Sequence, residues 1–556
     1  MSNEDWLEDT DWLEEGISHP FTVRTSASIH DQKQFQIKLD YDRTLLPNDV
    51  RKVINMEAYF FVPVSMGITS RTYSKEHFFS SLTNYLRIKT PRRPYWFEET
   101  ASLSIPSADA YLSLKASTRE RQNVEPLVIQ DTKLFGCYIN TVMKSLQMIL
   151  INGRDAVPTA NPEYVKSFKK RLERLFSRIQ IFRQKYVGGV QRFASLASPD
   201  VRKVFLLMDE YISYRVESWL LDYMQLLEPL SEDWASGLRE FLNKSVEKEV
   251  FYRSRYLIAE DNQLVLSKSR GPQAQEQVQY RLGLLKKYVY QVLYLEQEIV
   301  RRDKLFLNFM AMIGAALAAT FYGLATLQQM TLINQADNFW RLTAMFVVGI
   351  LAYVAKDRIK ELSREYFFKK LRKYLPDLEY KIVYNFLNIR GQKESVTVGN
   401  LAQYMQFVGR ALVPADILYL RDLESNFDLE PERQEEVFHF HRRFEMQPDS
   451  EDTDSHNVEH IKEVLRLDVS EYLNKMSDPR RSWQYWDLEK GVVKVDAPRV
   501  YHLNVVIRYT VTRFREEGTK IRHIEYQRLR LVMNKQGILR IDSVLDKGEI
   551  AMEEEL

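Results

Sequence analysis

The chain of 556 residues is too long for one hydrophobic core, and at about 150 residues per domain it predicts three or four structural units. Its 78 Lys and Arg and 76 Asp and Glu leave a net charge of only +2. This balance excludes a protein whose whole surface binds polyanions, so we expect no nucleic acid partner. The hydrophobic share of 45% excludes a mostly disordered chain, and the one cysteine, Cys137, excludes an intrachain disulfide.

The first 120 residues predict an acidic tail followed by a small domain. Residues 1–16 carry seven acidic residues, no basic one and no apolar run, so we expect no secretory signal there. Apolar and polar residues alternate over 35–41, which is typical of a strand with one buried face. Ser74 is a good N-cap for a helix that Pro91 would end. We therefore predict a small α/β domain over 17–120.

Residues 125–304 have helical periodicity. The helix that follows Asn161-Pro162 has an apolar stripe and an opposite, basic face. Such a face is often only solvated, but in a membrane-tethered protein it can contact anionic lipid headgroups. The candidate lipid-contacting residues are Lys166, Lys169, Lys170, Arg171, Arg174 and Arg178. Heptad-like spacing from Val278 to Val292 suggests a short coiled coil that continues as a stalk into the next helix.

An apolar hairpin is the strongest feature of the sequence. No charged residue lies between Lys304 and Asp337, and a helix over 305–327 is long enough to cross the ~30 Å hydrocarbon core. The shorter apolar stretch 339–355 predicts a second span, which leaves 328–338 as a short outer loop.

The charges that flank the two spans predict their orientation. Thirteen bases lie on the side of the chain ends, and Arg341 is the one base of the connecting segment. Under the positive-inside rule both termini are cytoplasmic. We expect an integral protein of the inner (plasma) membrane of a bacterium. The thirteen bases are Lys286, Lys287, Arg301, Arg302, Lys304, Lys356, Arg358, Lys360, Arg364, Lys369, Lys370, Arg372 and Lys373.

Small residues recur every four positions within the first span. Such a strip lets another helix backbone approach closely, either the second span of the same chain or a helix of a second subunit. The strip consists of Ala311, Ala315, Ala319 and Gly323.

The residues after the second span are predicted to form cytoplasmic regions. We expect a helical region over 356–447, a polar linker over 448–456 and a C-terminal α+β domain over 457–556. This last domain would begin with a helix over 458–472 and contain an antiparallel meander of three strands within 500–545. The predicted fold class is therefore an α+β membrane protein, mostly helical, with a small N-terminal α/β domain and a C-terminal β-meander domain.

Catalytic and cofactor motifs are missing from the sequence. It has no phosphate-binding glycine loop, no nucleophile elbow and no paired zinc-binding motif, so we expect neither a cofactor nor a catalytic residue. Cys137 lies in an apolar helical stretch and is best explained as a small core residue. The weak candidates for a metal site are His439, His441, His456 and His460, the last two being spaced i, i+4.

Three functions fit these observations. The first is a membrane-anchored, oligomeric scaffold that contacts membrane lipids, copies of itself and a cytoplasmic protein partner. The second is a channel or transport subunit, because long helices that lead into a two-span hairpin resemble the two-helix magnesium channels. The loop 328–338 lacks the Gly-Met-Asn triplet of that family, however, and about 200 residues follow the second span. The third is an enzyme with an unrecognised cytoplasmic site.

Overall fold

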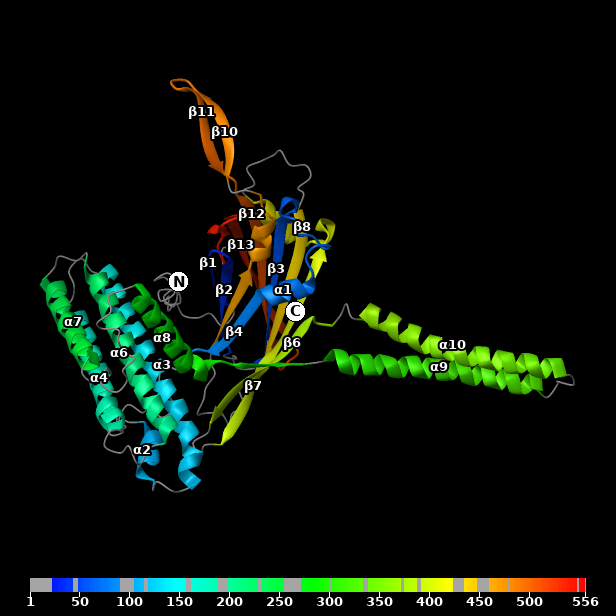
Figure 1. Ribbon diagram of the computed structural model, residues 1–556, viewed down its shortest axis with the longest axis horizontal. Coiled ribbons are helices and arrows are strands. Elements are labelled where there is room, and N and C mark those ends of the chain that lie inside the picture. The colour runs from blue at the N-terminus through cyan, green and yellow to red at the C-terminus, as the bar shows by residue number, and fades with distance from the viewer. Residues whose placement is uncertain are drawn as a thin grey trace.

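The protein is a mixture of helices and antiparallel sheets, as the α+β prediction states. In Figure 1 a helical bundle, a body of two sheets and a projecting helical hairpin follow one another along the long axis. The computed structural model describes residues 23–43, 49–90, 105–114, 119–156, 162–188, 198–228, 233–254, 272–300, 302–333, 339–371, 375–387, 392–423, 435–447, 460–477, 480–547 and 550–555.

Five long helices form the bundle. They pack closely, because an added Cβ at Gly136 would lie only 2.4 Å from the sulfur of Met208 and 3.1 Å from Val289. The short helix α2 (Pro106–Ser113) lies beside the first of them. The five are α3 (Arg119–Ala156), α4 (Pro162–Phe182), α6 (Pro199–Leu227), α7 (Asp233–Tyr252) and α8 (Pro272–Tyr290).

A largely buried arginine, whose side chain is 13% exposed, links two helices of the bundle to the end of α4. Arg183, in the π-helical turn after α4, donates to Asp209 of α6 at 2.7 Å and to Glu249 of α7 at 2.5 and 3.0 Å. Tyr252 donates to the second oxygen of Asp209 at 2.6 Å. Each charge therefore has a partner, as buried charges require.

The larger sheet has the order β14-β13-β12-β3-β8-β7-β6-β5, with β15 paired to β13, and every strand pair in it is antiparallel. The helix α11 (Ala415–Asp422) packs on its outer face against Tyr59, Phe61 and Val506. The strands are β3 (Asp49–Pro63), β5 (Glu296–Ile299), β6 (Leu378–Leu387), β7 (Lys393–Val408), β8 (Glu435–Met446), β12 (Tyr501–Arg515), β13 (Lys520–Asn534), β14 (Gly537–Leu545) and β15 (Ala551–Glu555).

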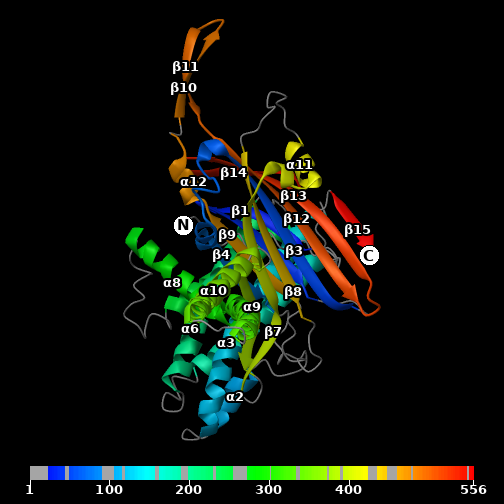
Figure 2. The same ribbon diagram turned by 90° about the vertical axis from the view of Figure 1, so that its right-hand side faces the viewer.

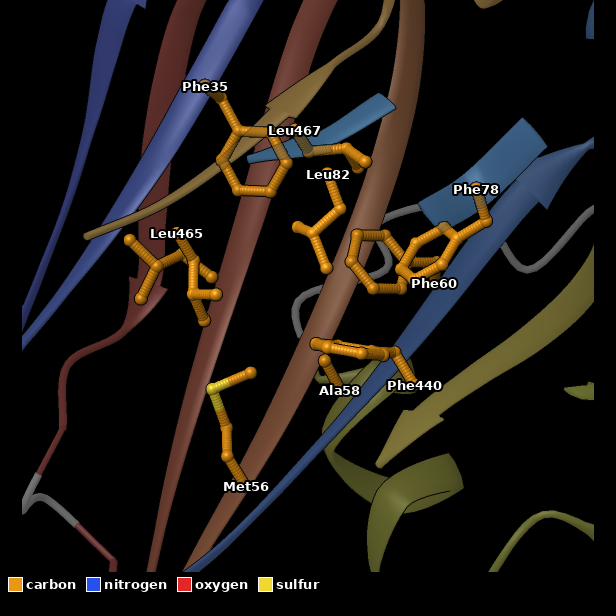
Figure 3. Close-up of a pocket in the computed structure, with 10 residues that line it drawn as sticks. Phe35, Met56, Ala58, Phe60, Phe78, Leu82, Phe440, Leu465 and Leu467 are labelled. Carbon is orange, nitrogen blue, oxygen red and sulfur yellow. The ribbon is translucent and has the colours of Figure 1, made fainter. Parts of the chain in front are cut away.

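The smaller sheet, of order β1-β2-β9-β4, packs against the inner face of the larger one. Apolar side chains from both sheets and from α1 fill the space between them, as the close-up in Figure 3 shows. Two short helices lie beside these strands, α1 (Lys75–Ser81) and α12 (Ser470–Lys475). The strands are β1 (Arg24–Asp31), β2 (Gln34–Asp42), β4 (Leu82–Ile88) and β9 (His460–Asp468).

The two ends of the chain share these sheets. In the larger sheet β3 lies between β12 and β8, and in the smaller sheet β9 lies between β2 and β4. Residues of the N-terminal domain expected over 17–120 and of the C-terminal domain expected over 457–556 therefore form one body. The three meander strands expected within 500–545 are β12, β13 and β14.

Three segments differ from the predicted secondary structure. The helix that Ser74 caps ends at Ser81, and the chain then continues as β4. The region 356–447 was expected to be helical, but it contains β6, β7 and β8 after the end of α10 (Phe339–Leu371). The helix expected over 458–472 is wrong, because residues 460–468 form β9.

The stalk prediction is also wrong. The helix α8 ends at Tyr290, and the strand β5 separates it from α9 (Arg302–Ile333). The heptad-like seam faces its own bundle: Leu285 and Val289 are buried, and Arg281 beside them pairs with Glu210 of α6. The seam is therefore explained by packing within one chain.

Candidate functional site

The hairpin of α9 and α10 is the largest exposed apolar feature of the described structure. Two described helical stretches are long and apolar enough to cross a membrane, Glu120–Ile151 in α3 and Asn308–Gln328 in α9. In the apolar 18-residue window of each stretch, 56% of the residues are buried in the first and only 17% in the second. Burial in the bundle explains the apolar sequence of α3, but nothing in the described part of the chain covers most of α9. In Figure 1 the hairpin projects away from the body.

The hairpin is inserted between two paired strands. It follows β5 and precedes β6, which pair antiparallel with Ile299 opposite Tyr380. The backbone N–H of Val300 donates to the carbonyl of Glu379 at 2.9 Å. The strand ends on either side of the hairpin therefore lie next to each other, and the body does not need the hairpin to complete its sheets.

The predicted strip of small residues lies beside the contact between α9 and α10. The most buried line of α9 consists of Met310, Gly314 and Ala318. An added Cβ at Gly323 would have no heavy atom within 4 Å. Packing of the exposed half of the strip on a second subunit stays a prediction. In the strip, Ala311 and Ala315 are half-buried, and Ala319 and Gly323 are exposed.

A second exposed apolar element is the two-stranded hairpin β10 (Arg480–Asp487) and β11 (Gly491–Pro498), which extends beyond the sheets in Figures 1 and 2. Trp486 is 71% exposed and Leu488 at the tip is 97% exposed. The turn is well formed: the Asp487 carboxylate accepts from two backbone N–H groups at 2.9 Å, and Gly491 has a φ of 72°. An isolated two-stranded hairpin is at best marginally stable in water. We call this element the β arm.

The β arm was not predicted, although the sequence contains a signal for it. Trp483 and Tyr485 alternate with polar residues, and Asp487 and Gly491 bound a turn. In the structure the rings of Trp483 and Tyr485 stack with their centroids 5.1 Å apart.

A polar row crosses the outer face of the larger sheet. The register aligns Tyr404 of β7, His441 of β8, Glu57 of β3, Arg508 of β12 and Tyr526 of β13. Each side chain points outward because the neighbours on either side of it in the chain face the core. We call this set the polar row.

The polar row is bound to α11. Arg508 donates to Glu57 at 2.7 Å and to Asp416 of α11 at 3.1 Å. The hydroxyl of Tyr526 donates to the same oxygen of Asp416 at 2.7 Å. The other oxygen of Glu57 lies 3.7 Å from Nε2 of His439. The carboxylates of Glu57 in the row and Asp416 in α11 are both engaged in these contacts. The row therefore fastens α11 to the sheet, and neither carboxylate is free to act as a general base.

Two of the predicted histidines lie next to each other here. His439 and His441 have parallel rings with centroids 6.0 Å apart, and His439 also stacks on Tyr59 at 4.3 Å. Burial, together with the nearby His441 and Arg508, lowers the pKa of His439 to about 3. Burial also lowers the pKa of His441. Both rings are therefore neutral at pH 7.

The four candidate metal ligands do not come together in the described structure. His460 begins β9 in the smaller sheet, whereas His439 and His441 lie in the larger sheet, and His456 lies outside the described residues. Among the described residues, no group of three or more His, Cys, Asp or Glu side chains is placed to hold a metal ion.

The helix α4, which carries the predicted basic face, lies at the end of the molecule opposite to the hairpin (Figure 1). Two of its candidate lipid contacts have partners in the bundle, since Lys169 lies over the ring of Phe241 and Arg178 contacts Tyr138. We call the other four the α4 basic face: they are exposed, and they are Lys166, Lys170, Arg171 and Arg174.

Neither the cysteine nor the described pocket has the reactive or polar groups of a catalytic or ligand-binding site. Cys137 is fully buried, and burial raises the pKa of its thiol to about 12. The pocket of Figure 3 lies between the two sheets and has only apolar lining residues, including Phe60, Phe78 and Phe440. It is therefore part of the core.

Comparison with known proteins gives no assignment: no family model, no curated protein and no solved structure matches this chain.

Proposed function

We propose that the protein is a membrane-anchored interaction protein that works as a homo-oligomer. The α9–α10 hairpin enters the bilayer, and the sheets and the bundle stay on the cytoplasmic side with both chain ends. We assign it to the inner (plasma) membrane of a bacterium. Its partners are membrane lipids, further copies of the chain and a cytoplasmic protein.

The exposed apolar surface of α9 carries this proposal. Full burial of one large aliphatic or aromatic side chain is worth about 1.5–3 kcal/mol, so a helix that leaves many of them exposed gains free energy when part of it enters an apolar medium. The side chains of α10 add to this surface, since Phe346 and Leu351 are exposed as well. Both helices also satisfy their backbone groups internally, which the hydrocarbon core requires.

The sign of the flanking charges supports the orientation. The bases of the hairpin cluster at the end joined to the body, and Arg341 is the one base near the tip. Because cytoplasmic loops carry the excess of Lys and Arg, we place the body in the cytoplasm.

The β arm supports the interaction role. Its aromatic side chains are exposed, and aromatic residues are enriched where proteins bind one another. In Figure 1 it points across the hairpin axis, so in an anchored molecule it extends alongside the membrane toward neighbours. A Trp486→Ser, Leu488→Ser variant should lose binding partners during purification in mild detergent and keep its membrane attachment.

Removal of the hairpin tests the anchor. A short Gly-containing turn in place of residues 302–374 should join β5 to β6, since their ends are already paired. We expect the shortened protein to be soluble and folded, whereas the full chain stays in the membrane after carbonate extraction. A matched chimera with an unrelated two-span hairpin should regain the membrane fraction and the partners.

Two results would contradict the proposal. A shortened protein that still sediments with membranes would place the anchor elsewhere. Ion flux through the purified full chain in liposomes, lost in the chimera, would favour the channel alternative.

A further inference from the structure

The two helices of the hairpin have apolar stretches of unequal length. The apolar part of α9 begins at Leu305 and continues to the tip, but α10 is apolar only as far as Ala355. The helices are antiparallel neighbours, so the charged end of α10, residues 356–371, runs beside the apolar beginning of α9.

A cluster of three side chains marks the level at which the charges begin. The amine of Lys356 lies 4.0 Å from the ring centroid of Tyr353 and 5.4 Å from that of Tyr322. The two tyrosine rings are 6.2 Å apart and nearly perpendicular. The three residues join both helices at one height, and we call them the collar.

The collar divides the hairpin into two parts. At 1.5 Å per residue, about 17 Å of α9 lies between Tyr322 and its end at Ile333, and about 30 Å lies between Arg302 and Tyr322. On α10, Tyr353 is about 21 Å from the start of the helix at Phe339.

The part between the collar and the body carries exposed charges of both signs. Arg358 and Glu361 are 75% and 72% exposed and pair at 3.2 Å. On insertion scales one such charge at the centre of a membrane helix offsets about five or more apolar residues. The part of α9 beside these charges gains less free energy from insertion into lipid than a fully exposed helix would, because Met310 and Ala318 are already buried against α10. Its exposed side chains include Phe309 and Met312.

Tyrosine and lysine are the residues expected at headgroup level. Tyrosine rings gather at both membrane interfaces, and a lysine near a helix end directs its amine to the headgroups. We infer that the collar of Tyr322, Tyr353 and Lys356 binds phospholipid headgroups and sets the depth of the hairpin. The segments 302–321 and 357–371 then form a neck outside the hydrocarbon core. This inference rests on the proposed membrane anchor.

The embedded part is short. About 17–21 Å of helix below the collar is less than the ~30 Å core, so the bilayer thins around the tip, as it does around other short helices.

Single cysteines on α9 test the collar. Phe309→Cys lies in the neck and Leu324→Cys lies below the collar, and both native side chains are exposed. The full chain is reconstituted in phosphatidylcholine–phosphatidylglycerol vesicles with the body outside and treated with a membrane-impermeant maleimide. Leu488→Cys in the β arm is the fully exposed reference, and the unsubstituted chain with its buried Cys137 is the blank.

We expect Phe309→Cys to react within about tenfold of Leu488→Cys and Leu324→Cys to react at least 100-fold more slowly. Glu361→Cys and Ile350→Cys should repeat this contrast on α10. If Phe309→Cys and Leu324→Cys are both slow, the hydrocarbon reaches the start of α9, so the collar inference fails while the anchor stands. If both react fast in vesicles that retain the protein, the anchor itself is wrong. Labelling in SDS confirms that every introduced thiol is reactive.

Discussion

Replacement of Glu463 by glutamine should destabilise the body more than any conservative change on its surface. The ion pair of Arg442 on β8 with Glu463 on β9 joins the two sheets, and its side chains are only 1% and 0% exposed. The hydroxyl of Tyr41 on β2 donates to the other carboxylate oxygen at 2.6 Å. Glutamine keeps the size and one acceptor but removes the charge.

The magnitude follows from the burial of the remaining partner. Loss of one member of a buried ion pair leaves the other charge without compensation and typically costs about 3–5 kcal/mol. We expect a loss of this size for Glu463→Gln, because Arg442 is buried among the apolar side chains of both sheets. Urea unfolding of the full chain in mild detergent, followed by circular dichroism, measures it.

Two controls separate the charge from the packing. The double variant Arg442→Met, Glu463→Leu removes both charges and should regain most of the lost stability, as apolar replacements of buried pairs often do. Glu240→Gln breaks the exposed i, i+4 pair with Lys244 on the bundle and should leave the urea midpoint unchanged. A loss below about 1 kcal/mol for Glu463→Gln would refute the claim that this pair joins the sheets.

Three further predictions concern charge and packing elsewhere. Because the folded pKa of His439 is about 3 and its ordinary value is 6.5, the folded state binds fewer protons between these values, so stability should fall as the pH drops below 6.5, by up to about 1.4 kcal/mol per unit. The pH series of urea midpoints should be flatter in His439→Gln than in the unsubstituted chain. Ala318→Leu should disturb the buried contact of α9 with α10 and lower the thermal stability of the hairpin in detergent, whereas Ala319→Leu, on the exposed side, should do so only if copies pack there. Reversal of the α4 basic face to glutamates should leave membrane fractionation unchanged, since α4 lies at the end of the molecule opposite to the hairpin in Figure 1; reduced membrane binding would instead support the lipid-contact prediction.

Features set by local sequence could be predicted, whereas features that depend on a distant partner could not. Ser74 accepts from the N–H of His77 as a cap, and the alternation of 35–41 appears as β2. Where α1 ends, however, the chain forms β4 because β9, from the other end of the sequence, pairs with it. The local sequence over 74–91 contains no signal for the pairing with β9.

The strands β9 and β7 were not predicted because each has a feature that breaks the regular alternation of a strand. In β9 the inward positions are Ile461, Glu463, Leu465 and Leu467, and the glutamate breaks the apolar alternation because its partner is a buried arginine on another strand. In β7 a bulge shifts the pairing, so that Ile382 faces Gly399 and the next residue, Val383, faces Thr397. The bulge changes which residues face inward, and buried Val398, Leu401 and Met405 acquire a spacing that resembles a helix.

Of the candidate functional features, the apolar hairpin could be predicted from the sequence and the polar row could not. The composition of 305–355 marked the apolar hairpin, because a long apolar stretch is visible in the local sequence. The polar row could not be foreseen, because it draws one residue from each of five strands that only the register brings together. The alternation of His439, His441 and Arg443 with Phe438 and Phe440 was a visible sign of an outward polar face.

The attachment points of the hairpin and the β arm bear on how an anchored molecule meets a partner. The hairpin leaves the larger sheet at its β5–β6 edge, and the β arm directly precedes β12 in the interior of the same sheet. Figure 2 looks from the hairpin toward the body and shows β12, β3 and β8 with α11 across one end. The face of the larger sheet on which α11 packs is therefore directed toward the bilayer in the proposed orientation. A neck outside the hydrocarbon would keep the body away from the headgroups, so a partner held by the β arm must fit the gap that the neck sets. Shortening α9 and α10 together by one turn each on the body side of the collar should then weaken partner binding while membrane attachment is kept.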